Sequence, residues 1–119
     1  MYSDLPAVEW LLTNLHEAVH RLASPAATQT SWVEENRVHT DELALELDVF
    51  DAIKWRGVRS DEAIQSLERL DAALHAMSGK EHADLWTADG LRSAPEWARV
   101  RQLASVAETL LPPRDATGV

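Results

Sequence analysis

The segment His16-Glu17-Ala18-Val19-His20 has residue types and a spacing that could support catalysis, because it matches the HExxH pattern. Residues four positions apart lie on the same side of a helix, so the imidazoles of His16 and His20 could bind one zinc ion. The carboxylate of Glu17 could then act as general base on a metal-bound water. Such a site requires a third ligand and a helix that turns both imidazoles toward the metal.

In these five residues the chain resembles the zinc metallopeptidases called zincins, which implies His16 and His20 as ligands and Glu17 as the base. Arg21 follows the second histidine, where that family usually has an uncharged residue, and no third-ligand motif such as HxxGxxH is present. The family's active-site helix lies under a β-sheet. No strands are predicted before the helix that contains His16 and His20 in this chain. We therefore predict a solvated helix face here and no bound metal, with a metal-dependent hydrolase as an alternative function.

Carboxylates are concentrated between positions 34 and 51. Seven acids stand there against the single base Arg37, namely Glu34, Glu35, Asp41, Glu42, Glu46, Asp48 and Asp51. The all-α nucleotide pyrophosphohydrolases bind magnesium through EExxE and a later ExxD, and the segment 68–71 resembles the second motif, with Glu68 and Asp71 as its acids. Val38 and Leu45 occupy the positions where the third acid of the first motif belongs. We therefore predict a solvated acidic surface.

The whole chain is acidic, with 20 aspartates and glutamates against 11 lysines and arginines and a formal net charge of −9. This charge repels nucleic-acid phosphates and anionic lipids, and the basic residues are scattered along the sequence. Nucleotide-binding and serine-hydrolase motifs are absent, and so is cysteine. We expect a basic protein partner, no cofactor, no direct binding of nucleic acid and no membrane binding.

Length and hydropathy predict one soluble domain over residues 1–119, with a frayed tail from about residue 112. No apolar run approaches the roughly 18 residues that span a bilayer. The N-terminus lacks the basic and apolar regions of a secretory signal, so we expect a cytoplasmic protein.

Apolar residues at helical spacing predict an all-α bundle of about four helices. The first helix is expected to end before Pro25, with a loop of small residues over 26–30. Ser31 and Glu34 have capping-box spacing and Gly57 is a matching stop, so residues 32–56 are predicted to form one long central helix. Its apolar residues fall on two sides, which predicts a homodimer.

A strand is the alternative for residues 43–49, because apolar residues there alternate with Ala44, Glu46 and Asp48. The third helix is expected from Ser60 to Gly79, followed by a helical turn near 83–86 that the pair 89–90 closes. A capping box of Ser93 and Glu96 should then begin the fourth helix, which ends before Pro112.

Aromatic and histidine residues add one candidate contact. Trp10 projects away from the apolar stripe of the first helix, beside Glu17 and Arg21. Exposed tryptophans are enriched at binding hot spots, so Trp10 is a candidate contact with a partner or with a second copy of the chain. Three histidines that stand alone are expected at or near the surface, namely His39, His75 and His82.

These features predict a non-catalytic acidic domain that binds a basic protein. In charge, size and helicity the chain is similar to bacterial toxin immunity proteins and phage-encoded inhibitors, although no motif supports that likeness. A helical homo-oligomeric scaffold or accessory subunit is a second alternative. The predicted partner face consists of Trp10, Glu34, Glu35, Asp41, Glu42 and Glu46.

Overall fold

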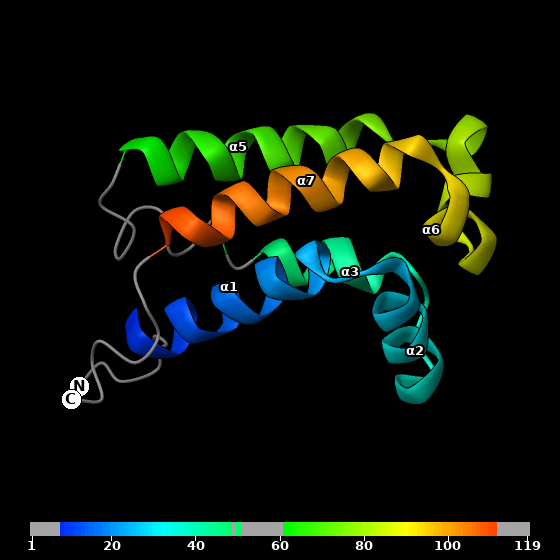
Figure 1. The fold of residues 1–119 in the computed structure, drawn as a ribbon, viewed down its shortest axis with the longest axis horizontal. Helices are drawn as coiled ribbons and strands as arrows, with labels where there is room; N and C mark the ends of the chain where they lie inside the picture. Colours follow the sequence, from blue (N-terminus) through cyan, green and yellow to red (C-terminus); the bar gives the residue numbers. More distant parts are fainter. Residues whose placement is uncertain (1–7, 49, 51–60, 112–119) are drawn as a thin grey trace.

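The computed structural model describes residues 8–48, 50 and 61–111, and the regular structure in these residues is entirely helical (Figure 1). The elements are α1 (Val8–Ala23), α2 (Ala26–Asn36), α3 (Glu42–Leu45), the 3₁₀ helix η1 (Glu46–Asp48), α5 (Asp61–Ala76), the 3₁₀ helix η2 (Lys80–Trp86), α6 (Ala88–Ser93) and α7 (Pro95–Leu110). The predicted all-α class is confirmed for these residues. Residues 43–48 form helical turns, so the alternative strand is wrong there. None of these helices has the length and apolar character needed to cross a membrane.

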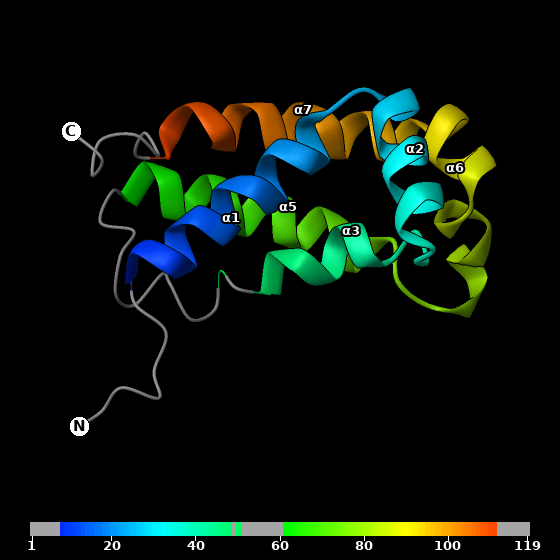
Figure 2. The ribbon, with the colours of Figure 1, turned by 90° about the horizontal axis from the view of Figure 1, so that it is seen from below.

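Three helices of 16 residues, α1, α5 and α7, run along the long axis of the molecule (Figures 1 and 2). Both α1 and α5 pack against α7, which runs in the opposite direction. The short elements α3 and η1 pack on α1, and α2 stands across one end, where it contacts α6. This arrangement differs from the predicted bundle of about four helices lying side by side.

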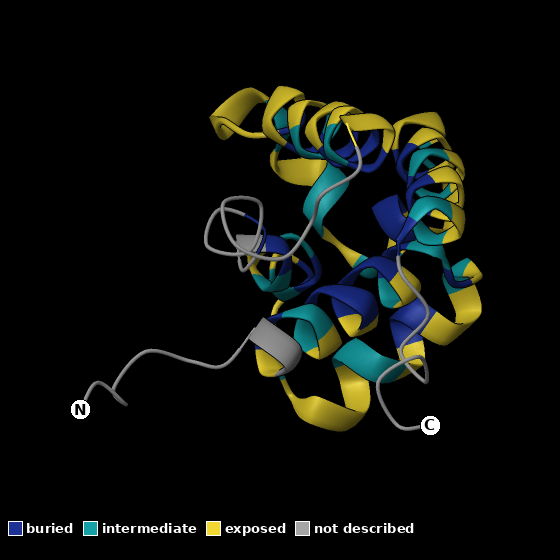
Figure 3. Ribbon diagram, turned by 90° about the vertical axis from the view of Figure 1, so that its left-hand side faces the viewer, coloured by how far each residue is buried: buried dark blue, intermediate teal, exposed yellow. Residues whose placement is uncertain are grey.

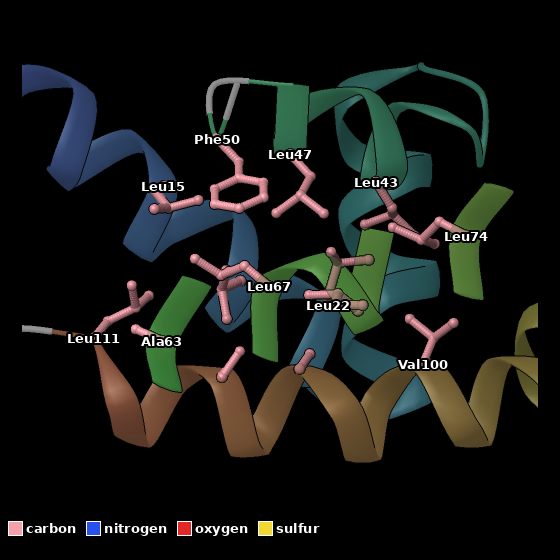
Figure 4. Packing of buried hydrophobic residues seen from close by; sticks show 14 of the residues in the cluster. Leu15, Leu22, Leu43, Leu47, Phe50, Ala63, Leu67, Leu74, Val100 and Leu111 are labelled. Atoms are coloured by element: carbon pink, nitrogen blue, oxygen red, sulfur yellow. The ribbon is translucent and has the colours of Figure 1, made fainter. Parts of the chain in front are cut away.

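The core lies between the three long helices and is closed by η1, α3 and Phe50 (Figure 4). Residues on the inward side of each helix recur every three or four positions, and exposed residues cover the outward sides (Figure 3). Burial of these apolar side chains is the main force that holds the helices together. Fully buried members of the cluster include Leu15, Val19, Leu22, Leu43, Leu67, Leu70, Leu91, Trp97, Val100, Ala104 and Ala107.

The start of α2 corrects the predicted loop over 26–30. The backbone N–H of Gln29 donates to the carbonyl of Pro25 over 3.0 Å, and the Thr30 hydroxyl donates to the carbonyl of Ala26 over 2.8 Å. Proline has a helix-compatible φ, here −57° at the N-cap, and alanine is the best helix former, so this segment favours a helix. Ser31 therefore lies inside α2 and does not cap it.

A buried polar contact fixes α2 against three other helices. Gln29 is fully buried, and its Nε2 donates to the carbonyls of Arg21 and Leu22 at the end of α1, over 3.1 and 3.0 Å. Its Oε1 accepts from Nη1 of Arg101 on α7 over 3.0 Å, and the same Nη1 donates to the Leu91 carbonyl of α6 over 3.0 Å. We call these residues the Gln29 contact.

The predicted long helix over 32–56 is wrong, because α2 ends at Asn36. Arg37 adopts a left-handed conformation with φ of 55°. Its N–H donates to the Glu34 carbonyl and the N–H of Val38 donates to the Val33 carbonyl, both over 3.2 Å, which is the Schellman pattern of a helix end. Glycine usually occupies this position. Because the residue here is arginine, the sequence gives no sign that the helix ends. A homodimer therefore no longer follows from the two apolar sides of one helix.

The C-terminal half follows the predicted helices more closely, with α5 ending shortly before Gly79, whose φ is 112°. The pair 89–90 does not close a helix but lies within α6. A side chain on Gly90 would meet the backbone oxygens of Leu85 and Asp84 at 2.5 and 2.6 Å, so this glycine permits the close approach of α6 to η2.

The predicted capping box at the start of α7 is wrong. Ala94 is the N-cap and makes no side-chain cap, while the Ser93 hydroxyl donates to the Asp89 carbonyl of α6 over 2.7 Å. Pro95 at the first position is enough to favour the helix start. Three predicted features, Ser60, Gly57 and the tail from 112, lie outside the described residues.

Candidate functional site

A cleft of about 400 Å³ separates the segment 39–45 from the C-terminal end of α5. The first wall contributes His39, Asp41, Ala44 and Leu45, and the second contributes Asp71, Leu74, His75, Ser78 and Gly79, with Trp86 of η2 beside them. We call this feature the acidic cleft. Its volume lies near the lower end of the roughly 300 to 1,000 Å³ that ligand sites occupy, so it suits a small group or one long side chain.

Two carboxylates from different elements enter the acidic cleft. Asp41 is exposed, and it has no ion pair with the part of the chain that the structure describes. Asp71 is half-buried, and its Oδ2 lies 3.5 Å from Nε2 of His75, one helical turn later. No lysine or arginine is among the described residues that line the cleft.

The tryptophan of the cleft is held in place from two directions. Nε1 of Trp86 donates to the Met77 carbonyl over 2.8 Å. The Trp86 ring also meets the buried ring of Trp97 edge to face, with centroids 5.3 Å apart and an interplanar angle of 81°. Trp97 is anchored in turn, since its Nε1 donates to the Leu85 carbonyl over 2.6 Å. The indole wall is therefore preorganised.

Apolar side chains complete the cleft. Leu74 is buried in the core cluster, where it faces Leu43 (Figure 4). Leu45 remains 49% exposed at the cleft, and among the described residues only Trp10 and Val106 are comparably exposed large apolar side chains. Of the groups in the cleft, the fixed tryptophan is of the residue type most enriched at protein-binding hot spots.

The predicted partner face is divided by the fold. Glu34 and Glu35 are exposed on α2, whereas Asp41 and Glu42 lie beyond the helix break. Of this face, Asp41 is the only member that lines the acidic cleft. The Asp48 side chain and Asp51 lie outside the described residues.

Glu46 is not a free surface carboxylate as predicted, because its Oε1 pairs with the guanidinium of Arg21 on α1. That guanidinium lies over the Trp32 ring of α2, 4.3 Å from its centroid. The Arg21 contact, made of Arg21, Trp32 and Glu46, therefore connects α1, α2 and η1. The sequence could not predict this contact, because its three residues belong to three different elements.

The HExxH residues are arranged differently from the predicted solvated face. Glu17 and His20 are exposed, and Nδ1 of His20 lies 2.7 Å from Oε2 of Glu108 on α7. His16, however, is only 8% exposed, because α1 is covered further around its circumference than its leucine stripe indicates. Within residues 8–48, 50 and 61–111, no three histidine, aspartate or glutamate side chains gather closely enough to hold a metal ion.

Trp10 is 57% exposed on α1, as its projection predicts. It lies eleven positions before Arg21, which is about three helical turns, so the two residues project from the same side of α1. His39 and His75 are exposed and His82 is half-buried, which confirms their predicted location at or near the surface.

Asp71, His75 and Trp86 were not predicted as site residues, although the first and second have the i, i+4 spacing of a helical pair. Nothing local in the sequence brings them to Asp41. No protein-family model matches the chain, and no curated protein or solved structure matches it either.

Proposed function

We propose that this chain is a non-catalytic protein-binding domain that recognises a basic protein, in the manner of an inhibitor or immunity protein. The acidic cleft is the observation that carries the proposal. Asp41 and Asp71 line it beside the exposed side chain of Leu45, and no lysine or arginine accompanies them among the described lining residues. A cationic side chain of another protein could form ion pairs with the carboxylates of this surface.

The charge of the chain supports the same partner. A formal net charge of −9 attracts a basic protein over several ångströms and raises the association rate. Glu34 and Glu35, both exposed on α2, extend the negative surface in the segment that precedes the cleft. Apolar contact with Leu45 and the indole of Trp86 would then slow dissociation, because desolvated anchors contribute most of the binding free energy.

Charge reversal tests this function. The variant Glu35→Lys, Asp41→Lys, Glu42→Lys should lose a partner that the wild-type chain retains from lysate of the host. The matched control, Glu68→Lys, Glu81→Lys, Asp84→Lys, changes the net charge equally at exposed positions and should retain the partner. The association rate measured with the purified partner should fall as salt rises, since screening weakens steering.

Three results would contradict the proposal. These are equal retention of the partner by all three proteins, an association rate that does not change with salt, and recovery of no specific partner by the wild-type chain. Glu46 is left unchanged in both variants because it pairs with Arg21, so its reversal would disturb the fold.

Self-association is a second candidate function, favoured by the exposure of Trp10 at 57% and Val106 at 53%. Large apolar side chains exposed on two long helices suit contact with a second copy. We expect light scattering to give a mass above 13.3 kDa that returns to this value in Trp10→Ala. A wild-type mass of one chain at high concentration would exclude this function.

A further inference from the structure

We propose that the acidic cleft binds an arginine side chain of the partner, with the guanidinium against Trp86 and its N–H groups donating to both Asp41 and Asp71. This inference rests on the proposed function and specifies the side chain that the cleft recognises. It begins from the kinds of group in the cleft: an indole, two carboxylates, the histidines His39 and His75 and an apolar wall, without a lysine or arginine among the described lining residues. His75 lies 3.5 Å from Asp71, so an arginine would share that carboxylate with the imidazole.

The same kinds of group already bind an arginine elsewhere in the chain. In the Arg21 contact, a guanidinium lies 4.3 Å from the Trp32 ring centroid and pairs with the carboxylate of Glu46. The acidic cleft offers the corresponding groups, Trp86 and the two aspartates, and no arginine is among its described lining residues. The Arg21 contact thus shows that a tryptophan and a carboxylate of this chain can bind one guanidinium together.

Arginine fits the cleft better than lysine for two physical reasons. Its guanidinium is planar and carries five donors, so it can pair with carboxylates from two elements while one face stacks on an indole. The lysine ammonium is compact and strongly hydrated, and it loses more hydration when it enters a site beside apolar groups. The methylene stem of arginine would lie along Leu45 and Ala44, which both line the cleft.

The fixed position of Trp86 favours binding. Its hydrogen bond to Met77 and its edge-to-face contact with Trp97 hold the ring before any ligand arrives. Little side-chain entropy would then be lost when a guanidinium stacks on it, and preorganisation of this kind strengthens binding.

Amino-acid amides test the inference without a known partner. N-acetyl-arginine amide is titrated into the ¹⁵N-labelled full chain, and the indole N–H resonance of Trp86, assigned with Trp86→Phe, reports occupancy. Two amides serve as controls. N-acetyl-lysine amide carries the positive charge without a guanidinium group, and N-acetyl-citrulline amide has a similar shape to the arginine amide but no charge. We expect the arginine amide to bind at least about fivefold more tightly than the lysine amide, and the citrulline amide not to saturate.

A pair of double variants locates the binding. Asp41→Asn, Asp71→Asn should weaken binding of the arginine amide by about tenfold, because both acceptors lose their negative charge while the guanidinium stays cationic. Glu34→Gln, Glu35→Gln removes the same charge from α2, outside the cleft lining, and should change the affinity less than about twofold.

Each remaining outcome overturns the inference. Equal affinity for the arginine and lysine amides would show that the cleft responds to charge alone. Binding that is unchanged in Asp41→Asn, Asp71→Asn would place the amide elsewhere, and an unperturbed Trp86 resonance at saturating amide would exclude the cleft. In all three cases the charge-reversal experiment still decides the proposed function, because a basic protein can bind the carboxylates of 34–42 without inserting an arginine.

Discussion

The Gln29 contact and the acidic cleft both place polar side chains among apolar neighbours, but among the described residues only the first gives a partner to each of them. Gln29 uses both its amide nitrogen and its amide oxygen, and Arg101 bridges it to the Leu91 carbonyl. Burial lowers the pKa of Arg101 from its ordinary value, and Nη1 donates to two neutral acceptors, Oε1 of Gln29 and the Leu91 carbonyl. In the cleft, Asp41 finds no such partner among the described residues.

The difference separates a structural role from the binding role that we propose for the cleft. Among the described residues, every buried side-chain nitrogen or oxygen has a hydrogen-bond partner. A buried group that lost its partner would destabilise the fold, so these contacts fix how α1, α2, α6 and α7 meet. Carboxylates at the edge of a cleft remain hydrated, and they can exchange water for a partner at little cost to stability.

Gln29→Met should have the largest effect on stability. Methionine preserves the shape of the side chain but removes the hydrogen bonds of Gln29 to the carbonyls of Arg21 and Leu22 and to the guanidinium of Arg101. The Arg21 carbonyl then keeps its bond from the N–H of Ser24. We expect the free energy of unfolding to fall by about 3 kcal/mol, measured by urea titration. Gln29→Glu should not rescue it, since its carboxylate would face two carbonyl oxygens. If Gln29→Met lowered the free energy of unfolding by less than about 1 kcal/mol, the Gln29 contact would not be more important for stability than the acidic cleft.

Asp41→Asn, Asp71→Asn should have the smallest effect on stability. Asp41 is exposed and Asp71 is half-buried with His75 as its neighbour, so neither carboxylate contributes more than about 1 kcal/mol to folding. The unfolding midpoint in urea should match that of wild type, while binding of the arginine amide is weakened. A destabilisation above roughly 2 kcal/mol would instead assign these aspartates a structural role.

Helical spacing alone predicted the three long helices. Leu15, Val19 and Leu22 mark α1, and comparable stripes mark α5 and α7, because a side that is buried along a helix must recur about every 3.6 residues. The exposure of Trp10 followed from the same projection. Such patterns need no knowledge of what the buried side packs against.

The break after α2 could not be predicted in this way. Helix ends are usually marked by glycine, and here Arg37 adopts the left-handed conformation at a cost of roughly 1 to 2 kcal/mol. Packing on either side offsets that cost, since Gln29 fixes the start of α2 and the Arg21 contact fixes its end against α1 and η1. These tertiary contacts, and not local propensity, determine the conformation of Arg37.

The sequence by itself determined the all-α class, the long helices and the excess of negative charge, since each depends on residue types and their spacing. Only the tertiary structure decided which residues lie beside each carboxylate. It paired Glu46 with Arg21, and it brought Asp71 and Trp86 to the same cleft as Asp41. Periodicity shows which side of a helix is buried but not the element that covers it, and a cleft between distant segments exists only after those elements have packed.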